Sequence, residues 1–520
     1  MRRFNIVPYP FLFALYSVLA IASANATELI PLHDLLRPLL LATAIADAAY
    51  LVALSAGPDP HRRAAGAGFA VLVCVTFWFW GDLFAWRQEV AGEVAAVVCA
   101  ALLIIVLNLF LRRSRRTFAG VSRYLNLFGG ILLFWSGGTL AWRHLHHVSV
   151  AVAQPLPVRS APVRGVDPDS SQRELPHVVV VILDKYTGAK SLRANFGFDD
   201  TPFEDGLRRR GFFVPGNAHA NYVQTFLALS AMLNWDYLDA QTKALGPDSH
   251  CWECFYPVLE DNRTWHALKD RGYEFVFLPT GLPATASNRY ADLELPSSRA
   301  ITHEFEAAWV RTTILLPLME AACASIRCSD AALPYAPESA ASLDWKFEQI
   351  PLLLRQQRPV YVFAHFTVPH EPYVYDAECR HRRPSWPERD DGPDSLQIKA
   401  DYVDQIRCVN RKVDRLVDAM AANSSRPLVV MLQADHGHGR MGRDQPSLSN
   451  APPDRVAERL DIFAAYRFPG APAGLVYDSI SPINAMRALM RFYFQLDLPP
   501  LEDASYWSSA DLPYKFARVR

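Results

Sequence analysis

Two apolar runs of this chain end abruptly in side chains that can bind metal ions. The segment PLVVMLQADHGHG passes from a hydrophobic stretch to Asp435, His436 and a glycine, and the segment HVVVVILDKYTG changes in the same way at Asp184. A buried strand that hands acids and histidines to a glycine-containing loop is one way in which an open α/β sheet builds a site. Each acid could instead cap a turn, and His436 could be a surface histidine. Two such strand ends nevertheless favour converging metal ligands.

Thr225 is a third candidate, in the segment NYVQTFLALSAMLN. It follows a polar stretch and stands immediately before an apolar run of helical character. A hydroxyl at this place could simply cap the helix. The same place also suits an anion, because the N–H groups at the start of a helix bind phosphate or sulfate oxygens. A nearby cation would lower the pKa of the hydroxyl enough to make it a nucleophile.

Together these residues resemble the metal site of the alkaline phosphatase superfamily. The resemblance is to its membrane-anchored sulfatase-like branch, which contains phosphoethanolamine transferases and lipoteichoic acid synthases. It implies that Asp184 is the acidic ligand after the first strand and that Asp435 and His436 are the late ligand pair. Thr225 is then a nucleophile that also binds the metal. The cofactor implied is one divalent ion, zinc or manganese.

The chain departs from this family pattern in two ways. The transferases usually have Glu where this chain has Asp184, whereas sulfatases have Asp, so this position favours a hydrolase. Sulfatases, however, use a Cys or Ser within Cys/Ser-x-Pro-x-Arg, and no such motif surrounds Thr225. The intact threonine therefore favours phosphorus over sulfate ester chemistry.

Further polar residues near the strand ends could contact a substrate. The segment FAHFTVPHEPYVY contains His365 and His370, and lone histidines at a strand end are usually structural. His370 is followed by Pro and an aromatic residue, which is similar to a phosphate-binding histidine segment of the family, so we expect it to bind phosphoryl oxygens or protonate the leaving group. His438 is a second such residue or a loop histidine. Lys185 and Arg440 could pair with an anionic substrate or belong to a charged surface.

The first 150 residues are expected to form a transmembrane domain. Five apolar stretches have about the length of a membrane span, although the first could be a signal peptide; they lie near 8–26, 35–56, 65–86, 90–111 and 125–142. Arginine-containing loops fall on alternate sides of these stretches, so the positive-inside rule places the C-terminal part outside the cytoplasm. We therefore expect an inner-membrane protein whose catalytic domain lies in the periplasm.

The remaining chain is expected to be a linker, 151–176, and one α/β domain, 177–520. The linker is rich in Pro, Ser, Arg and Asp. Alternating strands and helices beyond it predict a mostly parallel central sheet of the alkaline phosphatase or sulfatase type. Strands are predicted near 178–183, 212–214, 273–278, 360–366 and 428–433, and helices at 201–210, from Thr225, and at 394–422.

Six of the eight cysteines lie in the part expected to be exported, where disulfides can form. We predict the pairs Cys323–Cys328 and Cys379–Cys408, which leaves Cys251 and Cys254 as a local pair. A redox or zinc Cys-x-x-Cys site is the alternative for that last pair, but no second Cys-x-x-Cys accompanies it.

These features predict an integral-membrane, metal-dependent phosphotransferase. It would move a phosphoethanolamine or phosphoglycerol headgroup from a membrane phospholipid donor to an envelope glycan or lipid acceptor, through a Thr-linked intermediate. The alternatives are a sulfatase-like envelope hydrolase, either a phosphodiesterase or a sulfatase, and a non-catalytic scaffold that binds glycans or lipids. A formal charge of −1 argues against nucleic acid as the main partner. The sequence specifies neither the headgroup nor the oligomeric state.

Overall fold

The protein divides into two compact units in a computed structural model that describes residues 7–24, 32–77, 90–153, 174–295, 304–326, 338–385, 395–441 and 445–520. The helical unit comprises residues 1–152 and 299–337, and the sheet unit comprises residues 153–298 and 338–520. The expected catalytic domain 177–520 is thus interrupted, because its residues 299–337 pack with the N-terminal helices.

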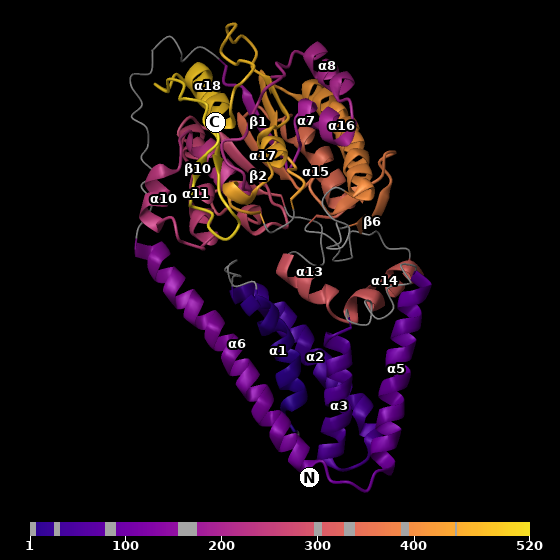
Figure 1. The fold of residues 1–520 in the computed structure, drawn as a ribbon. Coiled ribbons are helices and arrows are strands. Elements are labelled where there is room, and N and C mark those ends of the chain that lie inside the picture. Colours follow the sequence, from indigo (N-terminus) through magenta and orange to yellow (C-terminus); the bar gives the residue numbers. More distant parts are fainter. Residues whose placement is uncertain are drawn as a thin grey trace. The chain divides into compact units, whose positions relative to one another are not determined.

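The helical unit has a helix at each of the five apolar segments (Figure 1): α1 (Tyr9–Ala24), α2 (Leu36–Ala53), α3 (Pro60–Val75), α5 (Val90–Arg113) and α6 (Ala119–Ala153). Among the described residues, two stretches are long and apolar enough to cross a membrane, Leu36–Ala56 and Ala119–Trp142. A bundle of five membrane-spanning helices remains a prediction. Two further short helices belong to this unit, α13 (Glu304–Arg311) and α14 (Leu315–Ile326).

The sheet unit is built on a six-stranded sheet in the order β3-β2-β4-β1-β7-β8. The strands are β1 (His177–Leu183), β2 (Glu274–Leu278), β3 (Leu293–Glu294), β4 (Val360–Phe366), β7 (Leu428–Gln433) and β8 (Ala464–Arg467). Every residue of β1, β4 and β7 is buried, as expected of strands covered by helices on both faces. Only β8 pairs antiparallel within this sheet. The predicted mostly parallel sheet is therefore confirmed.

Helices cover both faces of the sheet (Figure 1). One group packs together as α7 (Ala189–Phe196), α8 (Thr201–Arg209), α15 (Ala340–Leu353) and α16 (Leu396–Asn423). The other contains α9 (Thr225–Asn234), α11 (Tyr256–Glu260), α12 (Arg263–Lys269) and α18 (Pro482–Phe494). The sheet unit also contains the helices α10 (Asp239–Leu245) and α17 (Pro453–Leu460). Two short strand pairs lie outside the main sheet: β5 (Tyr373–Tyr375) pairs with β6 (His381–Ser385), and β9 (Tyr506–Trp507) pairs with β10 (Ala517–Arg518).

The predicted strand at 212–214 is reduced to one residue. Phe213 forms an isolated antiparallel bridge with Tyr466 of the edge strand β8, through backbone hydrogen bonds of 2.8 and 2.9 Å. Pro215, which has no N–H, follows two residues later. The other predicted elements of this unit agree with the structure to within a few residues.

Two disulfides confirm two of the predicted pairings. Cys251 and Cys254 are bonded with a Cα–Cα distance of 5.6 Å, and Cys379 and Cys408 are bonded with a Cα–Cα distance of 5.0 Å. A bonded Cys251–Cys254 pair is not a zinc half-site, because its sulfurs are used by each other. The predicted Cys323–Cys328 pair involves Cys328, which lies outside the described residues.

Candidate metal centre

The candidate site lies where the central parallel strands end. Asp184 directly follows β1, and Asp435 follows the neighbouring strand β7 after one alanine. The register places Ile182 beside Gln433, so the two chains leave the sheet side by side. Because parallel strands present their carboxyl ends at one edge, two acids far apart in sequence arrive at the same place.

Three predicted metal ligands meet at this edge. Single ligand atoms of Asp184, Asp435 and His436 all lie within 4.8 Å of one another. The Nε2 atom of His436 is 4.0 Å from Asp184 Oδ1 and 3.3 Å from Asp435 Oδ2. Such spacings are those of side chains that surround one ion of about 2 Å bond length rather than bonding to each other.

Thr225 joins the same cluster. It is the first residue of α9, and its Oγ1 atom lies 3.2 Å from His436 Nε2. The residue at the N-cap is Gln224, so the alternative that Thr225 caps the helix is wrong. Thr225 is only partly buried, whereas the two acids and His436 are fully buried. Thr225 is therefore the most exposed of the four residues.

Unsatisfied oxygens show that the donor set fits a cation. Both carboxylate oxygens of Asp184 and the Oδ2 atom of Asp435 are buried and have no hydrogen-bond partner among the described residues. Buried carboxylates normally accept hydrogen bonds or bind a metal ion, because leaving them bare costs several kcal/mol, of the order of 1–3 or more per group. Two carboxylates, an imidazole and a hydroxyl suit either zinc or manganese.

The two carboxylates influence each other's ionisation. Burial raises the pKa of Asp435 to about 6, with the negative charge of Asp184 adding to the effect. Burial also opposes ionisation of Asp184, but its pKa lies below the usual range because His370, His365 and His436 favour the charged form. Two neighbouring buried carboxylates that are both ionised repel each other, so a positive charge between them would stabilise the pair.

His365 contacts the cluster from β4. Its Nε2 atom lies 3.4 Å from Asp184 Oδ2, and its Nδ1 atom lies 2.9 Å from the hydroxyl of Thr285. The sequence draws attention to His365 only as a histidine near a strand end. Its fully buried position on the strand beside β1 gives it a contact to the first acid.

His370 and Lys185 lie next to the first acid. The backbone N–H of His370 donates to the Asp184 carbonyl at 3.0 Å, and Lys185 Nζ forms an ion pair with Glu371 Oε1 at 2.8 Å. Burial would raise the pKa of Glu371, but the charges of His370 and Lys185 hold it well below its usual range. No pattern in the sequence singles out Glu371. The cation predicted to meet substrate is thus already paired with this carboxylate.

His438 is buried beside this group. Its Nε2 atom is 3.4 Å from the hydroxyl of Tyr373, and its Nδ1 atom accepts from the backbone N–H of Arg440 at 3.0 Å. Burial and the positive charge of Lys185 lower its pKa to about 3, so it is a neutral imidazole at physiological pH. A loop histidine in solvent, the alternative considered from the sequence, is wrong.

Arg440 is engaged with two acids. Its Nε atom donates to Glu458 Oε2 at 2.7 Å and its Nη2 atom to Asp454 Oδ2 at 2.5 Å. These ion pairs with α17 account for its burial without a substrate. A role in substrate binding remains a prediction.

Arg459 is a central residue that sequence reasoning missed. This buried guanidinium donates to the carbonyl of Val223 at 2.8 Å and to those of Gly437 and His438 at 3.2 Å each. It also lies 3.3 Å from His436 Nε2. Arg459 therefore ties the loop before Thr225 to the loop that carries the ligands. In the sequence it is one arginine of a short amphipathic helix and has no distinguishing mark.

The glycine after His436 has a packing reason. A Cβ atom on Gly437 would lie 2.1 Å from the carbonyl oxygen of Glu458. Its N–H donates to the Arg459 carbonyl at 2.7 Å, so this close approach of two backbones fixes the ligand loop on the end of α17.

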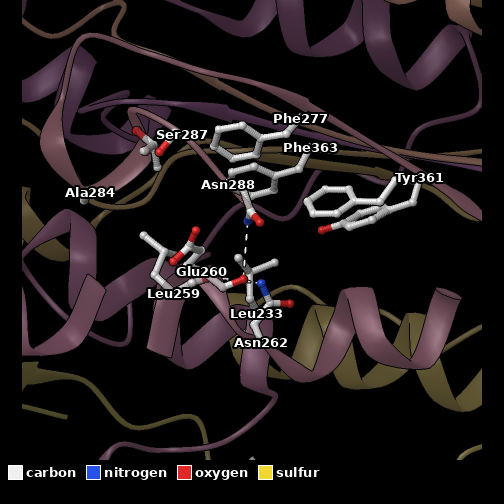
Figure 2. A pocket seen from close by; sticks show the side chains of 12 residues that line it. Leu233, Leu259, Glu260, Asn262, Phe277, Ala284, Ser287, Asn288, Tyr361 and Phe363 are labelled. Carbon is white, nitrogen blue, oxygen red and sulfur yellow. Dashed lines mark hydrogen bonds between the residues drawn. The ribbon is translucent and has the colours of Figure 1, made fainter. Parts of the chain in front are cut away.

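A separate small cavity lies between β2, β4 and α11 (Figure 2). Aromatic side chains line one side, Phe275, Phe277, Tyr361 and Phe363, and polar groups of Glu260, Asn262, Thr285 and Asn288 line another. None of the predicted site residues lines it. Thr285 alone connects it to the cluster, through its contact with His365.

A comparison with known protein families matches the part of the chain that contains the late ligand pair. The Sulfatase family model matches residues 321–471, which include His365, His370, Asp435 and His436 but not Asp184 or Thr225. No curated protein matches the chain.

Several solved structures are similar at a distance. The C-terminal periplasmic domain of EcEptC from Escherichia coli, in complex with Zn, is 13% identical, with 65% of this chain and 91% of that chain covered and a TM-score of 0.42. The soluble domain of lipooligosaccharide phosphoethanolamine transferase A from Neisseria meningitidis is 13% identical, with 62% and 88% covered and a TM-score of 0.38. The periplasmic domain of phosphoethanolamine transferase EptC from Campylobacter jejuni is 12% identical, with 66% and 94% covered and a TM-score of 0.37.

TM-scores below 0.5 are too low to support an assignment. The assignment therefore rests on the family match and on the geometry of the cluster. The matched segment contains the late ligand pair and also His365, whose Nε2 atom lies 3.4 Å from Asp184 Oδ2. Residues 321–471 thus match the Sulfatase family model, in agreement with the sulfatase-like resemblance of the sequence.

Proposed function

We propose that this protein is a metal-dependent phosphotransferase that uses Thr225 as its nucleophile. The sulfatase-type domain makes it an enzyme acting on esters of phosphorus or sulfur. The observation that carries the proposal is the Thr225 hydroxyl, 3.2 Å from His436 Nε2, at the start of α9 and beside two aspartates with three carboxylate oxygens that have no hydrogen-bond partner among the described residues. An unmodified threonine outside any Cys/Ser-x-Pro-x-Arg motif favours phosphorus chemistry.

Asp184, Thr225, Asp435 and His436 would hold one zinc or manganese ion. When bound, such an ion lowers the pKa of a hydroxyl and compensates charge on phosphoryl oxygens. The remaining roles belong to the chain itself. Arg459 keeps the threonine loop against the ligand loop. The N–H groups at the start of α9 would bind phosphoryl oxygens.

The donor we propose is a membrane phospholipid, because the sheet unit is joined to helices long and apolar enough to cross a membrane. In the first step the Thr225 oxygen bonds to phosphorus as the bond from phosphorus to the diacylglycerol oxygen breaks. The hydroxyl proton leaves to solvent. Because burial lowers the pKa of His370, its imidazole takes up a proton from solvent and passes it to the departing oxygen. An acceptor hydroxyl of an envelope glycan or lipid then displaces Thr225, which regains its proton.

Hydrolysis is the second candidate, favoured by Asp184 at a position where the resembling transferases have Glu. Here water would replace the acceptor hydroxyl. The two functions share all site residues, and we place both on the periplasmic side of the inner membrane.

The test is to incubate the full-length protein with vesicles of labelled phosphatidylethanolamine or phosphatidylglycerol and to look for an adduct on the Thr225 peptide by mass spectrometry. We expect an aminoethyl-phosphate or glycerol-phosphate adduct, its mass naming the donor. Thr225→Ser should keep an adduct and Thr225→Ala should lose both adduct and turnover. Full turnover by Thr225→Ala would contradict the proposal. Products formed with and without an acceptor glycan then separate transfer from hydrolysis.

A further inference from the structure

The segment α13–α14 interrupts the sheet unit in sequence but packs entirely as a part of the helical unit. The chain passes from the helical unit to the sheet unit near residue 153, returns near 299 and leaves again near 338. A simple N-terminal anchor with a linker requires only the first of these passages. The two additional passages enclose a pair of short helices, drawn beside α1, α2 and α3 in Figure 1.

Trp309 provides the main contact of this segment. Its side chain is fully buried in one cluster with small residues of α1 and α2, among them Ala14, Ala42 and Ala46. Its indole N–H donates to Ser17 Oγ of α1 at 3.1 Å. A large aromatic ring needs small residues opposite it, and its N–H needs an acceptor when buried. The helical unit supplies both.

Two further contacts fix the orientation of the segment. Glu306 is 1% exposed and pairs with Arg37 of α2, with 3.4 Å between Oε2 and Nη1. The backbone N–H of Ile314, between α13 and α14, donates to the carbonyl of Cys74 in α3 at 2.8 Å. The Ile314 side chain packs against Val73 and Phe77. Apolar, hydrogen-bonded and ionic contacts thus all bind the same pair of helices to α1, α2 and α3.

We infer that α13–α14 is a docking element that attaches the sheet unit to the N-terminal helices independently of the 151–176 linker. Its partner is the alanine-rich surface of α1 and α2 together with the end of α3. The sheet unit is then held at two places, once through the covalent linker and once through non-covalent packing. This attachment does not depend on the reaction that the sheet unit catalyses.

The experiment separates the two attachments in the full chain. A protease cleavage sequence is inserted between residues 153 and 174, an affinity tag is placed at the N-terminus, and the detergent-purified protein is cleaved and captured again on the tag. We expect the C-terminal fragment to elute with the tagged N-terminal fragment. Its appearance in the flow-through would overturn the inference.

Paired variants identify the contact that holds the fragments together. Trp309→Ala should release the C-terminal fragment after cleavage, whereas Leu318→Ala, on α14 and 46% exposed, should not. Release by Leu318→Ala but not by Trp309→Ala would mean that exposed apolar surface in a shared detergent micelle holds the fragments, and it would overturn the inference. Circular dichroism of the released fragment checks its folding. Should Trp309→Ala not accumulate, Glu306→Gln, which removes the charge of the ion pair, should release the fragment at a lower urea concentration than the unsubstituted protein needs.

Discussion

In the sheet unit, the buried pair Asp184 and Asp435 and the buried residue Asp200 have opposite surroundings. Asp184 and Asp435, each 1% exposed, have bare carboxylate oxygens and lie beside each other. Asp200, 2% exposed, accepts from the Tyr186 hydroxyl at 2.9 Å and from Asn410 Nδ2 at 2.6 Å. Burial raises the pKa of Asp200 to about 7, although both hydrogen bonds lower it.

The difference shows that burial alone does not identify an aspartate that binds a metal ion. Asp200 is buried with neutral donors around it, so it can keep its proton and act as a structural hydrogen-bonding group. In the pair at the strand ends, Asp435 Oδ1 accepts from the backbone N–H groups of Lys185 and His436, but the other three carboxylate oxygens have no hydrogen-bond donor among the described residues. The two carboxylates also lie beside each other and beside three histidines. Only the second arrangement has a free energy cost that a bound cation removes.

Removing one ligand should have the largest effect. Asp184→Asn keeps the shape of the side chain but removes a charged donor, so metal affinity should fall at least about 100-fold and turnover about 1,000-fold or more. Asp200→Asn is the matched control, since it neutralises a buried aspartate that has no metal to bind. Isothermal titration with zinc and manganese measures both. Equal affinities in the two variants would remove the distinction drawn between the two groups.

Replacing Arg459, the buried arginine that links the two loops, should have the second-largest effect. Arg459→Lys keeps the charge but cannot reach the carbonyls of Val223, Gly437 and His438 at once. We expect turnover to fall about 10–100-fold while metal affinity changes by less than about tenfold. An unchanged rate constant at saturating donor would show that the threonine loop is positioned without Arg459. Arg455→Lys on the same helix, a half-buried residue, serves as the control.

Removing one charge of the bare pair should stabilise the metal-free protein. The folded-state pKa of Asp435 is raised to about 6, so above that pH its ionisation costs stability, by roughly 1–3 kcal/mol. In EDTA at pH 8, Asp435→Asn should therefore melt at a higher temperature than the unsubstituted protein. Added zinc should stabilise only the latter. A lower melting temperature in EDTA would mean that the two carboxylates do not repel each other.

The smallest effect is expected for Asp200, the buried carboxylate that accepts hydrogen bonds from Tyr186 and Asn410. Because the folded-state pKa of Asp200 is raised, its contribution to stability is complete below the unfolded pKa of about 4 and is lost as the pH rises through about 7. Asp200→Asn should remove this loss, so its melting temperature relative to the unsubstituted protein should rise by a few degrees between pH 5 and pH 8. Asp199→Asn is the control, since the pKa of this exposed neighbour is lowered to about 2, outside the window. Parallel pH profiles for the Asp200 variant and the unsubstituted protein would contradict the assignment.

The sequence predicts those parts of the site that lie on regular elements. Asp184 and Asp435 are visible because an apolar run must stop where a buried strand leaves the sheet, and Thr225 is visible because a helical period begins there. His365, Glu371 and Arg459 were given no role, because their importance comes from contacts across the fold: a neighbouring strand, an ion pair with Lys185, and carbonyls of two distant loops.

The same distinction holds for the fold: its regular elements can be predicted from the sequence, whereas contacts between distant segments cannot. The parallel sheet follows from alternating strand and helix periods, and the two confirmed disulfides follow from cysteine placement. The interruption of the sheet unit at 299–337 could not be predicted, because α13 and α14 are too short to have a strong period and their amphipathic pattern does not specify a partner. The single-residue bridge found in place of a strand at 212–214 has a similar cause, since its extent depends on pairing with β8, which is far away in sequence.

The strand order has a consequence for synthesis of the protein. The valine-rich strand β1 has both of its neighbours far downstream, because Val178 pairs with Tyr361 and Val429. During translation, β1 emerges long before either partner exists, with two apolar faces and two unpaired edges. We expect this strand to be the aggregation-prone part of an incomplete chain, and an assisting chaperone to be needed until β7 has followed.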